Sequence, residues 1–238
     1  MMQPDELSIS VSFCGEQYVV LSDSPFVIGR EGDLAIDDNP FLHRQFLQLS
    51  HHDSLWWLAN VGNQLSATIA DAQGSMQAWL ASGARVPLVF DRTLVWFTAG
   101  PTTYEIEVIV GDSPFVPVEP MPSEAGDTTI GRTNFTPDQK LLVVALCEEA
   151  LRRLQPGTLT VPTSGEAAQR LGWTVTRFNR KLDNVCQKLT RTGVPGLHGG
   201  PGGLALNRRA RLVEYALATR LVEVRDLDLL PLNSLTAN

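Results

Sequence analysis

Apolar and polar residues alternate along much of the N-terminal part of the chain. Ile9, Val11 and Phe13 are separated by single serines, which places the apolar side chains on one face of a half-buried strand. The same alternation returns just before residue 110, and the short apolar runs in between are separated by Gly, Pro, Asn and Asp. Many short strands at this spacing predict an all-β antiparallel sandwich or barrel over residues 1–110.

A segment that is poor in apolar residues follows, and after it the apolar spacing becomes helical. Residues 111–134 are rich in Pro, Gly, Ser and acidic residues, a composition that predicts a linker without a core of its own. Thr136 is then followed by Pro137 and Gln139, which together are typical of a helix that begins with a capping box. We therefore expect a mostly α-helical domain over residues 135–238.

Two further helices are predicted by the same kind of signal. Thr163 begins a second capping box, and a short strand is predicted just before it, over residues 158–161. A longer amphipathic helix begins at Thr174 or Thr176 and runs to Gly193. The two helices and the tight turn between them form a helix-turn-helix pattern.

The stretch after the longer helix has the pattern of a β-hairpin. In GVPGLHGGPGGLALNRR two short apolar pieces flank a Gly/Pro-rich loop, which predicts a wing, and a final helix is expected over about 208–222. Helix, turn, helix and wing together resemble the winged-helix DNA-binding regions of bacterial regulators. The resemblance covers about residues 135–230 and implies that this domain binds double-stranded DNA.

Charge is divided unevenly along the chain. The net charge is -7, yet residues 1–135 hold 5 Lys/Arg and 17 Asp/Glu, a net charge of -12, and residues 163–211 hold 9 basic and 2 acidic residues, a net charge of +7. Such an asymmetry is typical of a nucleic-acid-facing segment or of an acidic segment with a basic partner. The acidic part would repel a polyanion if it folded close to the basic helix, or it would mask that helix.

The polar side chains of the longer helix lie opposite its apolar face. Arg and Lys contact phosphates or guanine, and Asn and Gln pair with adenine edges. The predicted nucleic-acid-binding residues are Thr176, Arg177, Arg180, Lys181, Asn184, Gln187, Lys188 and Arg191 on this helix, with Arg208, Arg209 and Arg211 beyond the wing. An ordinary solvated basic helix face is the alternative interpretation.

Three short motifs in the N-terminal part follow one another in a familiar order. Gly29-Arg30 follows a predicted strand, His43-Arg44-Gln45-Phe46 comes shortly after, and Asn63 opens the loop after the next strand pair. This order resembles a forkhead-associated (FHA) domain over about residues 5–110. The resemblance implies a β-sandwich whose loops bind a phosphothreonine of a partner protein. The residues expected to bind are Arg30, His43, Arg44 and Asn63.

The sequence also departs from the FHA pattern. His43 stands where the family has a serine, Leu65 stands where it has an asparagine, and Phe46 replaces a structural histidine. A charge-assisted hydrogen bond contributes about 1.5–3 kcal/mol, so losing two donors weakens phosphopeptide binding by roughly two orders of magnitude or more. We therefore expect a degenerate module that binds a protein partner, phosphorylated or not. Arg30 as a cation that only braces its loop is the alternative.

Thr128 and Thr129 in the acidic linker are candidate phosphorylation sites. A phosphate added there would be a dianion able to dock the linker on Arg30 and Arg44.

No catalytic or cofactor motif stands out in the sequence. The serine-hydrolase elbow, the Walker loop and the usual zinc spacings are missing, and Cys14, Cys147 and Cys186 are widely spaced. The N-terminus lacks the pattern of a signal peptide. We therefore expect a cytoplasmic, non-enzymatic signalling or transcriptional adaptor without cofactor or metal. A protein–protein scaffold or accessory subunit that binds neither DNA nor phosphothreonine is the alternative, and a homodimer is left open.

Overall fold

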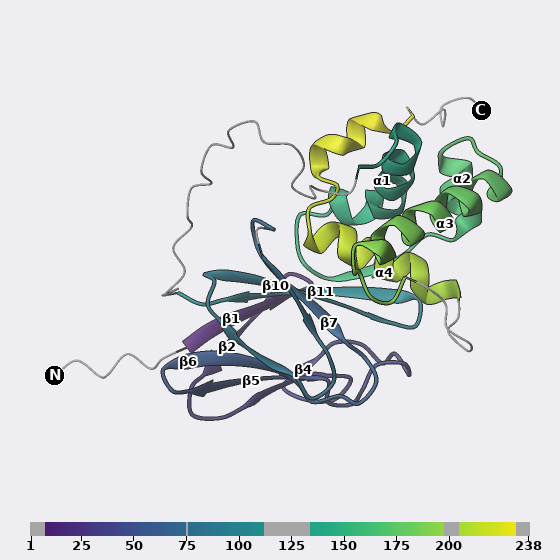
Figure 1. Cartoon of the computed structure of the whole chain (residues 1–238). Helices are drawn as coiled ribbons and strands as arrows, with labels where there is room; N and C mark the ends of the chain where they lie inside the picture. Colours follow the sequence, from purple (N-terminus) through teal and green to yellow (C-terminus); the bar gives the residue numbers. More distant parts are fainter. Residues whose placement is uncertain (1–7, 75, 112–133, 198–204, 232–238) are drawn as a thin grey trace, which may run out of the picture.

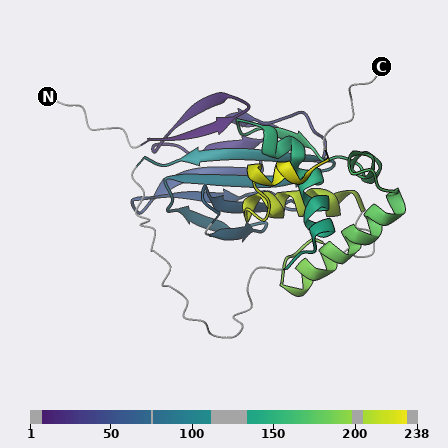
Figure 2. The same ribbon diagram turned by 90° about the horizontal axis from the view of Figure 1, so that it is seen from above.

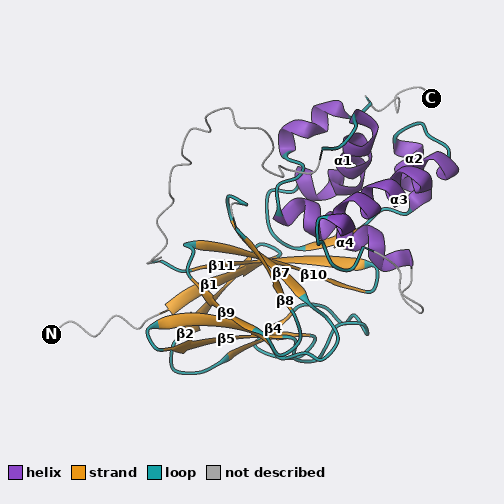
Figure 3. Cartoon of the chain, viewed as in Figure 1, coloured by secondary structure: helices purple, strands orange, loops and turns teal. Residues whose placement is uncertain are grey.

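The N-terminal part of the computed structural model is built from strands and the C-terminal part mostly from helices (Figures 1 and 3). The structure describes residues 8–74, 76–111, 134–197 and 205–231, and at 205–207 the backbone alone. The strands of the N-terminal part are β1 (Ser8–Phe13), β2 (Glu16–Leu21), β3 (Phe26–Gly29), β4 (Leu34–Ala35), β5 (Leu47–His52), β6 (Leu55–Asn60), β7 (Ala67–Asp71), β8 (Gln77–Leu80), β9 (Arg85–Leu88), β10 (Arg92–Ala99) and β11 (Thr102–Ile109).

These strands form two sheets that pack face to face. The first sheet has the order β2-β1-β11-β10-β7-β8, and the second has the order β4-β3-β5-β6-β9. All neighbours are antiparallel except β3 and β4. Phe46, Leu58, Phe97, Tyr104 and Ile106 are fully buried between the sheets. The predicted β-sandwich is therefore confirmed, and its alternating residues are divided between core and surface as the period of two requires.

The C-terminal part begins at the predicted capping boxes. Its elements are α1 (Pro137–Arg152), β12 (Thr158–Thr160), α2 (Ser164–Arg170), α3 (Val175–Arg191), α4 (Ala205–Ala218) and the 3₁₀ helix η1 (Val224–Leu229). The hydroxyls of Thr136, Thr163 and Thr174 each accept a backbone N–H three residues further on. Phe178 and Leu182 of α3 are buried, and α3 packs against α1 and α2, so the mostly α-helical class is confirmed.

The winged-helix fold itself is not shown. The second strand of the predicted wing is wrong, because Ala205 and the residues after it belong to α4. Ala, Leu and Arg favour helix, and Ala210, Leu212, Val213 and Ala216 form the buried face of α4. No strand is present at residues 194–197, while residues 198–204 lie outside the described part of the chain. The final helix was expected over about 208–222, but it begins at Ala205 and ends at Ala218.

The short strand before α2 is present, but it pairs with the sandwich. Residues Thr160, Leu159 and Thr158 of β12 lie opposite Thr102, Thr103 and Tyr104 of β11. On the same edge of β11, β1 pairs only with the far end of the strand. Backbone bonds from Cys14 N to Pro156 O and from Glu105 N to Gly157 O, each 3.0 Å, close the gap between β1 and β12. A strand of the C-terminal part thus completes the first sheet.

Helix α4 packs on the outer face of that same sheet. Figure 2 shows α4 and the segment after it lying over the strands. Ala218 and Leu217 of α4 pack with Ala70 and Trp96 of the sheet. Beside this apolar contact, Arg211 and Glu214 form an ion pair that is almost fully buried. Thr68 and Thr98 of the sheet donate to the Glu214 carboxylate, at 2.6 and 3.3 Å.

Along the described parts of the chain, no helix is long and apolar enough to cross a membrane.

Candidate functional site

Three loops meet at one end of the sandwich. Arg30 directly follows β3, His43 and Arg44 lie between β4 and β5, and Asn63 lies between β6 and β7. We call these four residues the loop site. The Arg30 N–H donates to the carbonyl of His43, and the N–H of Glu31 donates to that of Arg44, both at 2.8 Å. The structure thus brings together all four residues that the sequence placed at this site.

Gly29 is required where the first two loops touch. A Cβ at this position would collide with the backbone carbonyls of Arg44 and His43, which cannot move aside as flexible side chains do. Because Gly29 has no side chain, the loop that holds His43 and Arg44 can approach the end of β3, and this contact positions Arg30.

His43 and Asn63 bind each other. Asn63 Oδ1 lies 2.8 Å from His43 Nε2, and the Asn63 backbone N–H donates to the same nitrogen at 3.3 Å. The imidazole stacks on the Phe46 ring at a centroid distance of 5.8 Å, and its Nδ1 is buried with no hydrogen-bond partner among the described residues. The side chains of His43 and Asn63 therefore join two loops, a role that the sequence reading did not assign to them.

Phe46 anchors the loop between β6 and β7. Its side chain is fully buried and meets Phe97 edge to face at 4.9 Å, and its carbonyl accepts the N–H groups of Val61 and Gly62, at 2.9 and 3.2 Å. The loop between β6 and β7 is thus held by backbone bonds and apolar packing.

Two asparagines that the sequence reading missed brace the loops from inside. Asn60 donates to the carbonyls of Leu65 and Leu80, at 2.8 and 3.1 Å. Asn39 donates at 2.9 Å to the hydroxyl of Tyr104, and burial raises the pKa of that phenol to about 12. An asparagine in a loop, as Asn39, or at the end of a strand, as Asn60, was the available signal, since this side chain satisfies backbone groups in turns.

Two guanidinium groups remain for binding at the loop site. Arg44 Nε lies 3.3 Å from Glu31 Oε1, but both side chains are more than half exposed, and such surface pairs contribute little. No carboxylate among the described residues pairs with Arg30. Phe41 and Val61, on the same loops, are 64% and 46% exposed. The loop site therefore offers two cations beside apolar surface, which suits an anionic group on a polypeptide.

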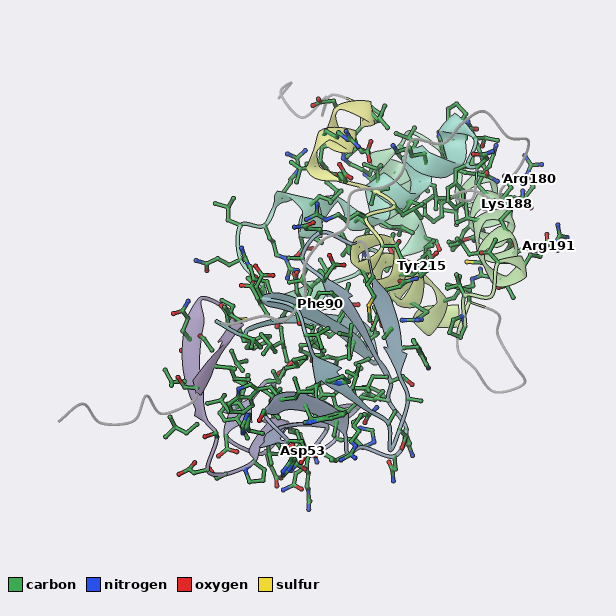
Figure 4. The ribbon with its side chains drawn as sticks, turned by 60° about the vertical axis from the view of Figure 1, so that its left-hand side comes forward. Asp53, Phe90, Arg180, Lys188, Arg191 and Tyr215 are labelled. Atoms are coloured by element: carbon green, nitrogen blue, oxygen red, sulfur yellow. The ribbon has the colours of Figure 1, made fainter. Side chains whose placement is uncertain are left out.

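The residues predicted to contact nucleic acid lie mainly along α3. Figure 4 shows Arg180, Lys188 and Arg191 on the side of α3 that faces away from the sandwich. Arg180 and Arg191 are exposed and have no ion-pair partner in the described parts of the chain. Thr176, Asn184 and Gln187 are exposed on the same helix. This helix therefore presents polar groups and two unpaired cations to solvent.

Other cations of this set are engaged within the C-terminal part. Arg177 and Lys181 pair with Asp138 of α1 at 3.1 and 3.0 Å, and hydrogen bonds from Lys181 and Arg177 lower the pKa of that carboxyl. Lys188 donates to Gln139 at 2.8 Å, Arg208 pairs with Asp183 at 2.7 Å and Arg209 donates to Ser164 at 3.0 Å. The acidic partners of these cations, Asp138 of α1 and Asp183 of α3, thus belong to the C-terminal part and not to the sandwich.

Arg211 does not belong to this surface. Its side chain is 9% exposed, it pairs with Glu214, and its guanidinium carbon lies 3.7 Å from the centroid of the Trp79 ring. The expectation that Arg211 grips a nucleic-acid backbone is therefore wrong, because the side chain is buried between α4 and the sandwich.

Thr128 and Thr129 lie outside the described residues. Within the described ranges, no group of three or more His, Cys, Asp or Glu side chains is arranged to hold a metal ion.

Comparison with known proteins gives matches in structure only. No protein-family model matches the chain. No curated protein matches it either. The chain is similar to the FHA-1 domain of Rv1747 from Mycobacterium tuberculosis, with 16% identity, a TM-score of 0.35, and coverage of 45% of this chain and 99% of that domain. It is also similar to the FHA domain of a hypothetical protein from Arabidopsis thaliana, with 13% identity, a TM-score of 0.35, and coverage of 50% of this chain and 99% of that domain. Both matches lie in the N-terminal half.

Proposed function

We propose that the protein is a non-enzymatic adaptor whose loop site binds an acidic or phosphorylated segment of a partner protein. The observation that carries the proposal is Arg30, a cation without a carboxylate partner among the described residues, held by Gly29 next to the exposed Arg44. Charge-assisted bonds from two guanidinium groups favour an anion with several oxygen atoms. The exposed Phe41 and Val61 beside them favour a polypeptide that carries this anion.

Only part of the loop site is available to an anion, so we expect its affinity to be modest. His43 and Asn63 bind each other, so neither offers its full set of donors to a ligand. A phosphothreonine is bound by Arg30 and Arg44, and a glutamate in its place retains part of the affinity.

The test compares three degenerate peptide libraries that differ only at the central residue, which is phosphothreonine, glutamate or threonine. We expect the full chain to bind them in that order of affinity in a fluorescence polarisation assay. Arg30→Ala removes a charge-assisted contact of about 1.5–3 kcal/mol, so phosphopeptide affinity falls at least tenfold. Arg152→Ala, an exposed arginine of α1, is the matched control and leaves binding unchanged. Equal binding of the phosphothreonine and threonine libraries contradicts the proposal.

A second candidate function is binding of double-stranded DNA by α3, as part of a transcriptional role. The observation that favours it is the pair of exposed, unpaired cations Arg180 and Arg191 on the outer side of α3 (Figure 4). Two phosphate contacts give an affinity for random duplex DNA that falls with salt, with a logarithmic slope of about -2. Replacing both arginines by glutamate abolishes this binding, whereas absence of binding by the unmodified chain at about 50 mM salt rejects the function.

A further inference from the structure

A cleft of about 770 Å³ lies between the sandwich and the C-terminal part, away from the loop site. Its floor is the outer face of the first sheet, where Glu105 and Glu107 of β11 lie beside Trp96 and Leu94 of β10. One wall is formed by the residues after α1, and the other by those after α4. Small-molecule sites measure about 300–1,000 Å³ and favour such interfaces. The size and place of the cleft therefore suit a small ligand.

The carboxylates of the cleft are already neutralised. Arg92 Nε donates to Glu107 at 2.8 Å, Arg153 pairs with Glu105 at 3.0 Å, and Arg225 pairs with Glu223 at 3.0 Å. Arg220 is the remaining cation of the cleft, and no carboxylate among the described residues pairs with it. Within the described part of the chain, its guanidinium donates to the carbonyl of Ala72 in the turn after β7. The cleft therefore carries one uncompensated positive charge, which favours an anion.

Arg220 also has a backbone conformation that favours glycine. Its φ is 49°, and it follows α4 at the position where the N–H groups of Arg220 and Leu221 return to the carbonyls of Leu217 and Ala216, at 3.1 and 2.9 Å. Glycine is usual at this place in the helix-ending motif, since a side chain is strained there. An arginine held at a strained position next to a cleft points to a functional side chain.

Apolar side chains complete the walls of the cleft. Leu154 is 99% exposed and Val224 is 64% exposed, and both line the cleft with the partly buried Leu217. Trp96 Nε1 at the floor and Arg153 Nε on one wall are buried donors without an acceptor among the described residues, so an additional acceptor nearby is stabilising. The walls suit an apolar body, and the donors suit a ligand that carries oxygen acceptors.

We propose that this cleft binds a small amphiphilic anion, whose charged group pairs with Arg220 and whose apolar body lies against Leu154, Leu217 and Val224. The site is independent of the loop site, because none of Arg30, His43, Arg44 and Asn63 lines the cleft. It gives the protein a small-molecule ligand in addition to a protein partner.

The test uses two fluorescent probes that differ in one charged group. These are 8-anilinonaphthalene-1-sulfonate and the uncharged N-phenyl-1-naphthylamine, each titrated into the full chain. We expect the sulfonate to bind saturably with one site per chain and at least tenfold more tightly than the neutral probe. No saturable binding of the sulfonate, or equal affinity for the two probes, overturns the proposal.

Arg220→Gly separates a ligand-binding role from a structural one. Glycine relaxes the backbone at this position, so we expect the thermal midpoint to stay unchanged or to rise while sulfonate affinity falls at least tenfold and that of the neutral probe is retained. If Arg220 serves only to hold Ala72, the midpoint falls and both probes are affected alike, which overturns the proposal. Arg152→Ala outside the cleft is the control of equal charge change and leaves both affinities unchanged.

Leu154→Ser provides a variant that does not depend on Arg220. Because the Leu154 side chain is 99% exposed, its replacement leaves folding intact, and we expect both probes to bind at least threefold more weakly. Unchanged binding overturns the proposal. Competition with 1-naphthoate and 1-naphthyl phosphate then distinguishes a carboxylate from a phosphate head group by which one displaces the sulfonate at the lower concentration. Failure of both at millimolar concentration also overturns it.

Discussion

Replacing Glu214 by alanine lowers the free energy of unfolding by about 3–5 kcal/mol, because it leaves a buried charge without its partner. The Glu214 side chain is 3% exposed and that of Arg211 is 9% exposed. Burial raises the pKa of Glu214 and lowers that of Arg211, so each charge depends on the other and on the hydroxyls of Thr68 and Thr98. Without the carboxylate, the Arg211 guanidinium stays between α4 and the sheet with only neutral acceptors.

Urea unfolding followed by circular dichroism measures this effect. Glu149→Ala, an exposed glutamate on α1, is the control and changes the free energy of unfolding by less than about 0.5 kcal/mol. The double variant Arg211→Leu/Glu214→Leu regains most of the loss, since a buried ion pair is often replaced by apolar side chains at little cost. A loss of less than about 1 kcal/mol for Glu214→Ala would show that the pair is solvated, contrary to its burial in the structure.

Replacing Glu105 by glutamine makes the protein relatively more stable as the pH rises, by about 3 kcal/mol between pH 4.5 and pH 8. Burial raises the pKa of the Glu105 carboxyl from 4.5 to about 7, Arg153 partly opposes the rise, and Glu107 adds to it. The folded protein thus holds this proton more tightly than the unfolded chain does. The stabilisation is fully present below pH 4.5 and is lost as the pH rises through about 7.

The measurement is the difference in free energy of unfolding between the Glu105→Gln variant and the unmodified chain at several pH values. Comparing the two proteins at each pH cancels the other titrating groups. The difference moves in favour of the variant with a midpoint between pH 4.5 and 7. A difference that stays constant over this range shows that the Glu105 carboxyl is solvated, and the strand pairing between β11 and β12 beside it would then be looser than the structure has it.

The sequence was sufficient for features that depend on neighbouring residues. Alternating apolar residues predicted the strands of the sandwich, because the side-chain period of two decides which face is buried. Thr136 and Thr163 predicted where α1 and α2 begin, since a cap needs only an N–H three residues away. For α3 the sequence left Thr174 and Thr176 open, and Thr174 is the cap. The order of Gly29, His43 and Asn63 also predicted which loops lie together, and these loops do meet at one end of the sandwich.

The sequence was insufficient wherever the outcome depends on distant residues. The sequence predicted a short strand over residues 158–161 but named no partner for it, and in the structure Thr158–Thr160 pairs with β11 of the sandwich. The apolar residues after 204 fit a helix as well as a strand, and packing on the sheet decided for α4. Arg180 and Arg211 were both predicted to contact nucleic acid, yet Arg180 is exposed and Arg211 is buried.

Sequence alone was thus enough for the two classes of structure, for the starts of α1 and α2, and for the loops that meet at one end of the sandwich. Tertiary contacts were needed to tell which of the basic residues are free, because ion pairs such as Arg177 with Asp138 and Arg211 with Glu214 require particular helices and sheets to meet. The same holds for Arg220, whose charge stands alone in the cleft because the surrounding arginines lie within reach of glutamates from other elements. Local periodicity and capping act within a few residues, whereas charge compensation and strand pairing act across the fold.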